Sequence, residues 1–106
     1  MNGPDWHERE SFAGADLRQA TFDRHHFKMC DLSRADLRGA SLRGASFDFC
    51  DLRGADLRDA DLTYATFGRV LTHDPMGGRT DVTGARFDGA DLRKVTADDV
   101  IGWPAE

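Results

Sequence analysis

The chain has 106 residues, a net charge of −5 and 40% hydrophobic residues, which fits one globular domain. Its sequence contains no apolar run of about 18 residues, the length a membrane span needs, and no charged, apolar and small-residue leader opens it, so we expect a cytoplasmic protein. The acidic balance also argues against direct nucleic-acid binding, which favours a basic stripe.

Residues 1–9 precede the regular pattern and include Trp6, in the segment WHERESF. A stack of repeated units leaves its core open at each end, so terminal segments must cover it. We therefore predict that residues 1–9 form an N-terminal cap and that Trp6 covers the open end.

From residue 10 onward the chain has a period of five. A Leu or Phe recurs at every fifth position from Phe12 to Phe67, and a small residue usually stands two positions before it. An α-helix turns about 100° per residue and a flat strand alternates its side chains, so neither places these residues on one stripe. A coil with flat five-residue sides does, because the large and the small residue of an extended side both point inward.

A coil of four sides sorts the inward positions by chemistry, whereas a coil of three sides does not. The predicted core columns are Phe27, Phe47, Phe67 and Phe87 in one, and Cys30 with Cys50 in another. Stacked cysteines would have Cα atoms about 4.8 Å apart, within the range of a disulfide. We nevertheless predict free thiols, because Cys commonly behaves as a small buried hydrophobe and in-register parallel neighbours have poor disulfide geometry.

The motif ADLRG at residues 35–39, repeated with one change at 55–59, resembles the signature of the pentapeptide repeat family. The resemblance covers about residues 10–94. It implies an all-β fold, a right-handed quadrilateral β-helix, and at this length the solenoid should have about five coils. The family has many roles, so the resemblance predicts the fold far better than the function.

The pattern fails at residues 70–81, VLTHDPMGGRTD, where Pro75 stands in place of a small residue. Because Val82 resumes the period of five, the segment is either a loop or two degenerate sides that keep the path of the coil. The functional alternative is a partner-contacting loop on a Gly-Gly hinge. Its candidate contact residues are His73, Met76 and Arg79.

Residues 95–106 are predicted to form the C-terminal cap, with Trp103 in VIGWPAE covering the second open end. Val95 and Val100 replace the usual small residue at inward positions, which indicates that the last turn widens or closes.

The sequence carries no phosphate-binding glycine loop, G-x-S-x-G or CxxC motif, so we predict a protein that is not an enzyme and holds no cofactor or metal. Columns of Asp beside columns of Arg indicate a solvated ladder of ion pairs and not an acid/base pair. His25 and Cys30 should point inward on adjacent sides while His26 points outward, so the three do not converge on a metal.

The leading functional hypothesis is a protein-protein interaction scaffold, with the side that carries the Phe column as its contact surface. Met29 and Phe49 should stack at one corner of that side, with Arg69 able to lie on the Phe49 ring. Tyr64 marks a different corner. The partner is another protein or a second copy of the chain.

The alternative is a modulator of DNA gyrase or another topoisomerase, by inhibition or by quinolone protection. Some proteins resembling this one bind these enzymes as acidic rods that imitate DNA. A length of about 23 Å of duplex carries about 14 negative charges, against an excess of five here. With a regular coil throughout, the four sides carry net charges of −1, −2, −1 and +1, so none resembles a phosphate backbone.

Overall fold

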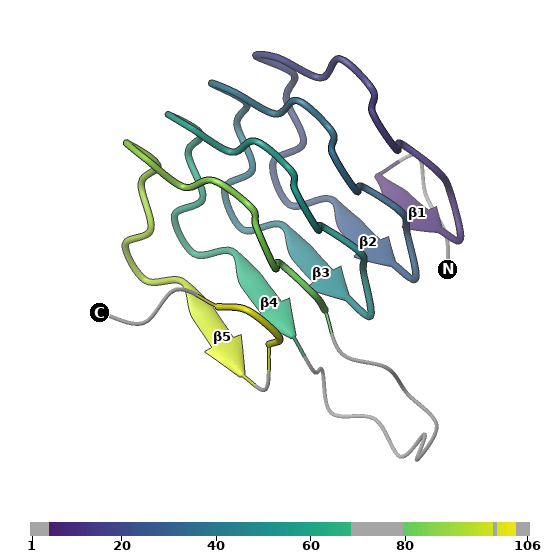
Figure 1. Cartoon of the computed structure of the whole chain (residues 1–106). Helices are drawn as coiled ribbons and strands as arrows, with labels where there is room; N and C mark the ends of the chain where they lie inside the picture. The colour runs from purple at the N-terminus through teal and green to yellow at the C-terminus, as the bar shows by residue number, and fades with distance from the viewer. Residues whose placement is uncertain (1–4, 69–79, 99, 104–106) are drawn as a thin grey trace.

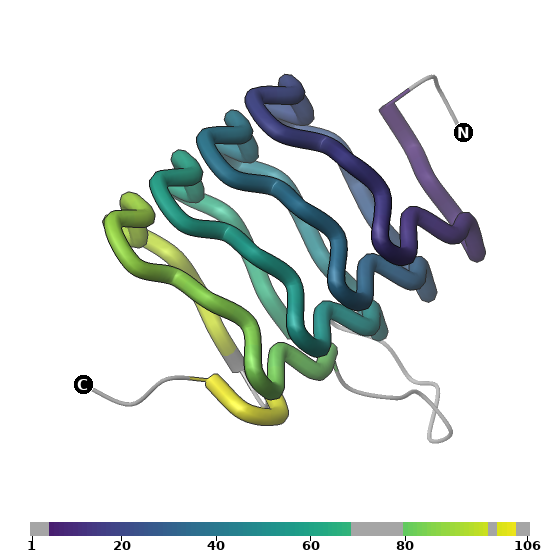
Figure 2. Tube along the Cα trace, turned by 45° about the horizontal axis from the view of Figure 1, so that its top comes forward, coloured from purple at the N-terminus to yellow at the C-terminus, as the bar shows by residue number. Residues whose placement is uncertain are grey.

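The computed structural model describes residues 5–68, 80–98 and 100–103, and within these ranges the chain is an all-β solenoid (Figure 1). One five-stranded parallel sheet, in the order β1-β2-β3-β4-β5, forms one side of the stack. Its strands are β1 (Trp6–Glu8), β2 (His26–Lys28), β3 (Ser46–Asp48), β4 (Thr66–Gly68) and β5 (Thr96–Asp98). The coils follow one another along a single axis, with β1 and β5 at opposite ends of the stack (Figure 2). The predicted quadrilateral solenoid is confirmed.

The other three sides of each coil are held by single parallel bridges, as from Asp16 to Asp36. Each corner is a turn. The N–H of Ala15, for example, donates to the carbonyl of Phe12 at 2.9 Å, and the third residue of that turn, Gly14, has φ = 67°. One short extended segment and one turn together take five residues, which is the physical origin of the period.

The core lies inside the stack and consists of the large and small residues of the repeat. Phe27, Phe47 and Phe67 are each at most 1% exposed and stack in register, with ring centroids 5.1 and 4.8 Å apart. Cys30 and Cys50 are buried free thiols. The Cys50 thiol donates to the Phe27 carbonyl at 3.2 Å, so its polar hydrogen is satisfied inside an apolar core.

The register changes between β4 and the following coil. Asp31 pairs with Asp51 across one regular coil, but Asp51 pairs with Asp81, two repeats further along the chain than a regular coil would place its partner. The ten additional residues therefore do not take the place of two regular sides in the register of the described residues. The candidates His73, Met76 and Arg79 lie outside the described residues.

This shift overturns one predicted core column. Phe67 pairs with Ala97 in the sheet, whereas Phe87 follows Arg86, which bridges to Asp56 on a different side. Phe87 therefore meets the ring of Phe67 edge-on, at 6.4 Å, and does not continue the stack. The prediction assumed an unbroken four-sided coil, and the extra segment moves every later position by two sides.

The register assigns each five-residue segment to one of four sides. The first side holds 10–14, 30–34, 50–54 and 80–84, the second holds 15–19, 35–39, 55–59 and 85–89, the third holds 20–24, 40–44, 60–64 and 90–94, and the fourth carries the sheet.

An aromatic ring closes each end of the core, and at the N-terminal end it does not belong to the predicted residue. Trp103 packs on Phe67, with ring centroids 5.2 Å apart, at the C-terminal end. At the other end His7, and not Trp6, stacks on Phe27 at 4.7 Å. Trp6 lies beside His26, which points out of the sheet. Strand alternation explains the difference, since only one of two adjacent residues can face the core. Both β1 and β5 fall in segments predicted as caps.

A small network of imidazoles accompanies the stacked His7. Its Nε2 lies 2.9 Å from Nδ1 of His25, and its Nδ1 lies 2.9 Å from a carboxylate oxygen of Glu10. Burial and the nearby charge of His7 lower the pKa of His25. The folded state therefore disfavours the protonated form of His25.

Deleting residues 70–79 should leave the fold intact, because it restores the regular length of the coil without removing a described side. We expect a cooperative unfolding transition and a free energy of unfolding within about 1 kcal/mol of the parent, measured by urea denaturation followed by circular dichroism. The matched deletion of residues 36–45 removes two sides of an intact coil and should abolish the transition. Equal damage from both deletions would contradict the register.

Acidification should destabilise the N-terminal end through His25. The unfolded state binds a proton near the ordinary pKa of about 6.5 and the folded state only at lower pH, so stability is present at higher pH and falls as pH drops through this range. His25→Ala, which restores the residue common at this position, should flatten the dependence of the urea midpoint on pH between about 7.5 and about 5.5. The exposed His26→Ala is the control, and an unchanged slope in His25→Ala would rule the explanation out.

Candidate functional site

The register shift changes which charges share the third side. With a regular coil, residues 80–84 would stack beside 60–64, but the N–H of Tyr64 donates to the carbonyl of Arg93 at 3.1 Å. Residues 90–94 therefore occupy that place and bring Arg93 and Lys94 with them. The third side now holds four basic and three acidic residues, a net charge of +1 instead of −1. The described residues of the first, second and fourth sides carry −2, −1 and −2.

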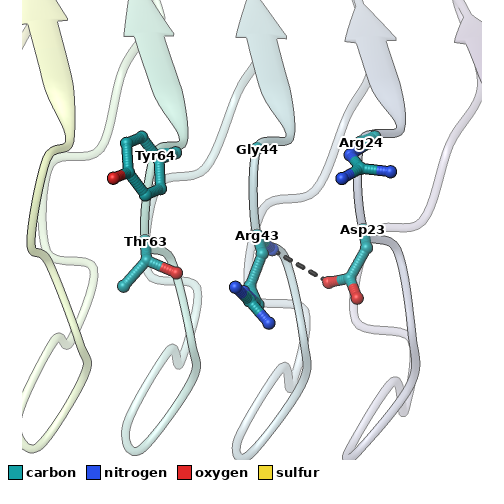
Figure 3. Close-up of a pocket in the computed structure, with 6 residues that line it drawn as sticks. All are labelled: Asp23, Arg24, Arg43, Gly44, Thr63 and Tyr64. Carbon is teal, nitrogen blue, oxygen red and sulfur yellow. Dashed lines mark hydrogen bonds between the residues drawn. The ribbon is translucent and has the colours of Figure 1, made fainter.

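A groove runs across this basic side. Figure 3 shows Arg24 and Tyr64 on either side of Gly44, with Arg43 in the adjacent column. We call this the Tyr64 groove, and its lining residues are Asp23, Arg24, Arg43, Gly44, Thr63 and Tyr64. Beyond Tyr64 a second hollow continues it, lined by Arg43, Asp61, Thr63, Tyr64, Arg93 and Lys94.

Backbone pairing fixes the walls of the groove. Arg24 donates its N–H to the Arg43 carbonyl at 2.8 Å, and Gly44 donates to the Thr63 carbonyl at 2.9 Å. Gly44 has φ = 67°, and a Cβ there would lie 3.4 Å from Cγ of Arg24. The stem of Arg24 thus lies over the glycine, and the absence of a side chain at Gly44 leaves the hollow beside Tyr64 open.

Tyr64 is the most exposed large hydrophobic residue of the described chain, with 65% of its surface accessible. It also has φ = 64°, a left-handed conformation that costs a non-glycine residue about 1 to 2 kcal/mol. The same turn position holds glycine at some corners of the solenoid and other non-glycine residues, such as Arg24 and Lys94, at others. What distinguishes Tyr64 is its exposed aromatic ring, which gains little from folding, and aromatic residues are enriched where proteins bind one another.

Arg43 differs from the other arginines that follow a repeat centre. Five of them form a two-pronged ion pair with the Asp two residues earlier: Arg18, Arg38, Arg53, Arg58 and Arg93. The fork at Arg58 lowers the pKa of Asp56 to about 2. Arg43 instead follows Ser41, and its Nε lies 3.9 Å from the carboxylate of Asp61.

The missing carboxylate at position 41 has a local explanation. The Ser41 hydroxyl donates to Asp23 at 2.5 Å, and the backbone N–H of Arg43 donates to the same oxygen at 3.0 Å. Asp23 therefore binds the backbone of Arg43 and leaves its guanidinium, in a side chain that is 62% exposed, without a forked partner among the described residues.

The predicted Met29 and Phe49 corner is less accessible. Both residues take the left-handed conformation, with φ of 56° and 55°, but both are half-buried. Burial raises the pKa of the neighbouring Asp48. Arg69 lies outside the described residues, so its predicted contact with Phe49 stays a prediction.

Sequence reasoning singled out Tyr64 but missed Arg43, Arg93 and Lys94. Two signals were available. Ser41 interrupts the Asp-x-Arg pattern of the repeat, and the break at residues 70–81 allows the later segments to change sides.

No set of three metal-ligating side chains converges within the described residues. The same part of the chain contains no helix that could cross a membrane.

The geometry defines a parallel β-solenoid of five-residue sides, and a family model for the pentapeptide repeat region matches residues 8–74. The chain belongs to the pentapeptide repeat family. A search of curated proteins finds no match.

Several solved structures are similar. A pentapeptide repeat protein from Nostoc is 26% identical, with 87% of this chain and 77% of that chain covered and a TM-score of 0.53. A thylakoid lumen protein of Arabidopsis thaliana is 32% identical, over 92% and 69% of the chains, with a TM-score of 0.43. QnrB1, a plasmid-mediated fluoroquinolone resistance protein, is 19% identical over 89% and 80%, with a TM-score of 0.38. That likeness carries no argument about function.

Proposed function

We propose that this pentapeptide repeat protein is a non-enzymatic scaffold that binds another protein through its third side, around Tyr64. The observation that carries the proposal is the exposed aromatic ring beside a groove. Tyrosine supplies a large contact area at low cost in side-chain entropy, and it is enriched among the residues that dominate binding energy. We also propose that this binding occurs in the cytoplasm.

The choice between the two predicted surfaces depends on exposure. Met29 and Phe49 are half-buried, so a partner on the fourth side would gain less apolar contact from each of them. Tyr64 offers most of its ring, and adjacent hollows give a partner side chain a place to pack. The fourth side is therefore the second candidate for the contact surface.

Charge does not favour the alternative function as a DNA mimic. The described sides carry net charges of −2, −1, +1 and −2, far below the one negative charge per about 1.7 Å of duplex DNA. The basic third side would also oppose a surface that a topoisomerase reads as DNA.

Tyr64→Ser should reduce recovery of the native partner about tenfold or more, because a central aromatic anchor contributes about 2 kcal/mol or more. The measurement is a quantitative pull-down from the native cell lysate with the purified full chain as bait. Folding should be unaffected, since an exposed substitution typically changes stability by about 0.5 kcal/mol or less.

Phe49→Ser is the matched control, as another aromatic at a left-handed corner. Loss of the partner with Phe49→Ser alone would move the contact surface to the fourth side. A partner retained by both variants would contradict both surfaces. Capture of topoisomerase subunits that is indifferent to Tyr64 would favour the DNA mimic, which a supercoiling assay then tests.

A further inference from the structure

We infer that the Tyr64 groove binds an acidic segment of a partner protein, with the guanidinium of Arg43 taking a carboxylate of that segment. This inference rests on the proposed function, because it names the chemistry of the partner that the third side would hold. It comes from three observations about charge on this side.

The first observation is that Arg43 lacks the two-pronged ion pair that arginines at the same repeat position form elsewhere. Arg53, at the same repeat position and 63% exposed, donates from Nε and Nη2 to Asp51 at 2.9 and 2.7 Å. Arg43 has nearly the same exposure, 62%, but no carboxylate two residues before it. A planar guanidinium with both prongs accessible is suited to bind one carboxylate with two parallel hydrogen bonds.

The second observation is the set of cations around Arg43. Arg24 and Lys94 stand at the corner column on either side of Gly44 and Tyr64, and neither forms an ion pair with a described residue. Arg93 is already paired with Asp91 at 2.6 Å, so it adds little free charge. Arg24, Arg43 and Lys94 thus have no two-pronged ion pair with a described residue. Together they give the groove a positive potential on a molecule whose net charge is −5.

The third observation is the charge of the neighbouring sides, which favours an acidic peptide over a nucleic acid as the ligand. The second and fourth sides, which flank the third, carry −1 and −2 among the described residues, so phosphates that extended past the third side would meet acidic surfaces. A short acidic segment can remain within the basic side. The exposed Tyr64 ring next to Arg43 further favours a segment with an apolar or aromatic residue adjacent to its carboxylate.

The inference is tested with two labelled peptides that are identical except that one carries Glu and the other Gln on both sides of a single Phe. Fluorescence anisotropy with the full-length protein should show the Glu peptide binding about tenfold or more tightly than the Gln peptide, as expected for a charge-assisted pair. Binding should weaken as salt rises from about 50 to about 300 mM.

Arg43→Gln should lower affinity for the Glu peptide about tenfold and remove the preference over the Gln peptide. Arg43→Lys keeps the charge but loses the fork, and should recover only part of the affinity. Arg53→Gln is the matched control, with the same repeat position and exposure on another side, and should leave binding unchanged.

A double variant, at constant net charge, tests whether the missing carboxylate at position 41 is what leaves Arg43 available to a ligand. Asp23→Ala with Ser41→Asp moves one carboxylate to the position that forms the fork elsewhere in the repeat. Arg43 should then bind its own Asp, and affinity for the Glu peptide should fall about as far as in Arg43→Gln. The single variant Asp23→Ala, which removes a negative charge from the groove, should bind at least as tightly as the parent.

Equal binding of the two peptides, or full affinity in Arg43→Gln or in the double variant, would overturn the inference. Preferred binding of duplex or single-stranded nucleic acid would also overturn it. So would self-association lost with Arg43→Gln, because the occupant would then be a second copy of the chain. None of these results would affect a partner interaction that depends on Tyr64 in the pull-down. The inference of an acidic ligand can therefore fail while the proposed function stands.

Discussion

Backbone pairing between successive coils holds the rest of this structure in place. The N–H of Asp36 donates to the carbonyl of Ala15 in the coil before, and the N–H of Leu37 donates to the carbonyl of Asp56 in the coil after, at 2.9 and 2.8 Å. These bonds recur on every side, so each residue is aligned with the residue at the same place in the next coil. Like side chains then stack on like, which is why the rings of Phe27 and Phe47 lie nearly parallel, at 4°.

The same pairing leaves little freedom for function except at the corners and the outward positions. Inward positions are occupied by side chains that fill a close-packed core, and a change of volume there is costly. At the corners only a positive φ is demanded, so Gly44 and Tyr64 can stand one above the other with very different surfaces. Chemical variation at this protein's surface therefore collects where the coil turns.

Much of the candidate site could have been read from the residues, and part could not. Tyr64 was visible as a large residue at a corner, and the Ser41 exception was visible as a break in the Asp-x-Arg pattern. The neighbours Arg93 and Lys94 were not, because their place depends on how much of the chain leaves the coil before Thr80. His7 was missed although it stands five residues before Phe12, in frame with the repeat centres, because the pattern was read only from Phe12 onward.

The five-residue period by itself determined the all-β coil and its inward residues, because these follow from local geometry that repeats along the chain, and the 20-residue spacing of like core residues indicated four sides. Only the tertiary structure decided that Phe67 faces Ala97 and not Phe87, and that the basic residues of 90–94 stand beside Tyr64. The physical reason is that a period of five survives when two whole repeats leave the coil. The spacing therefore says that a residue points inward or outward, but not on which side of the stack it lies, and the long-range backbone pairing alone fixes that.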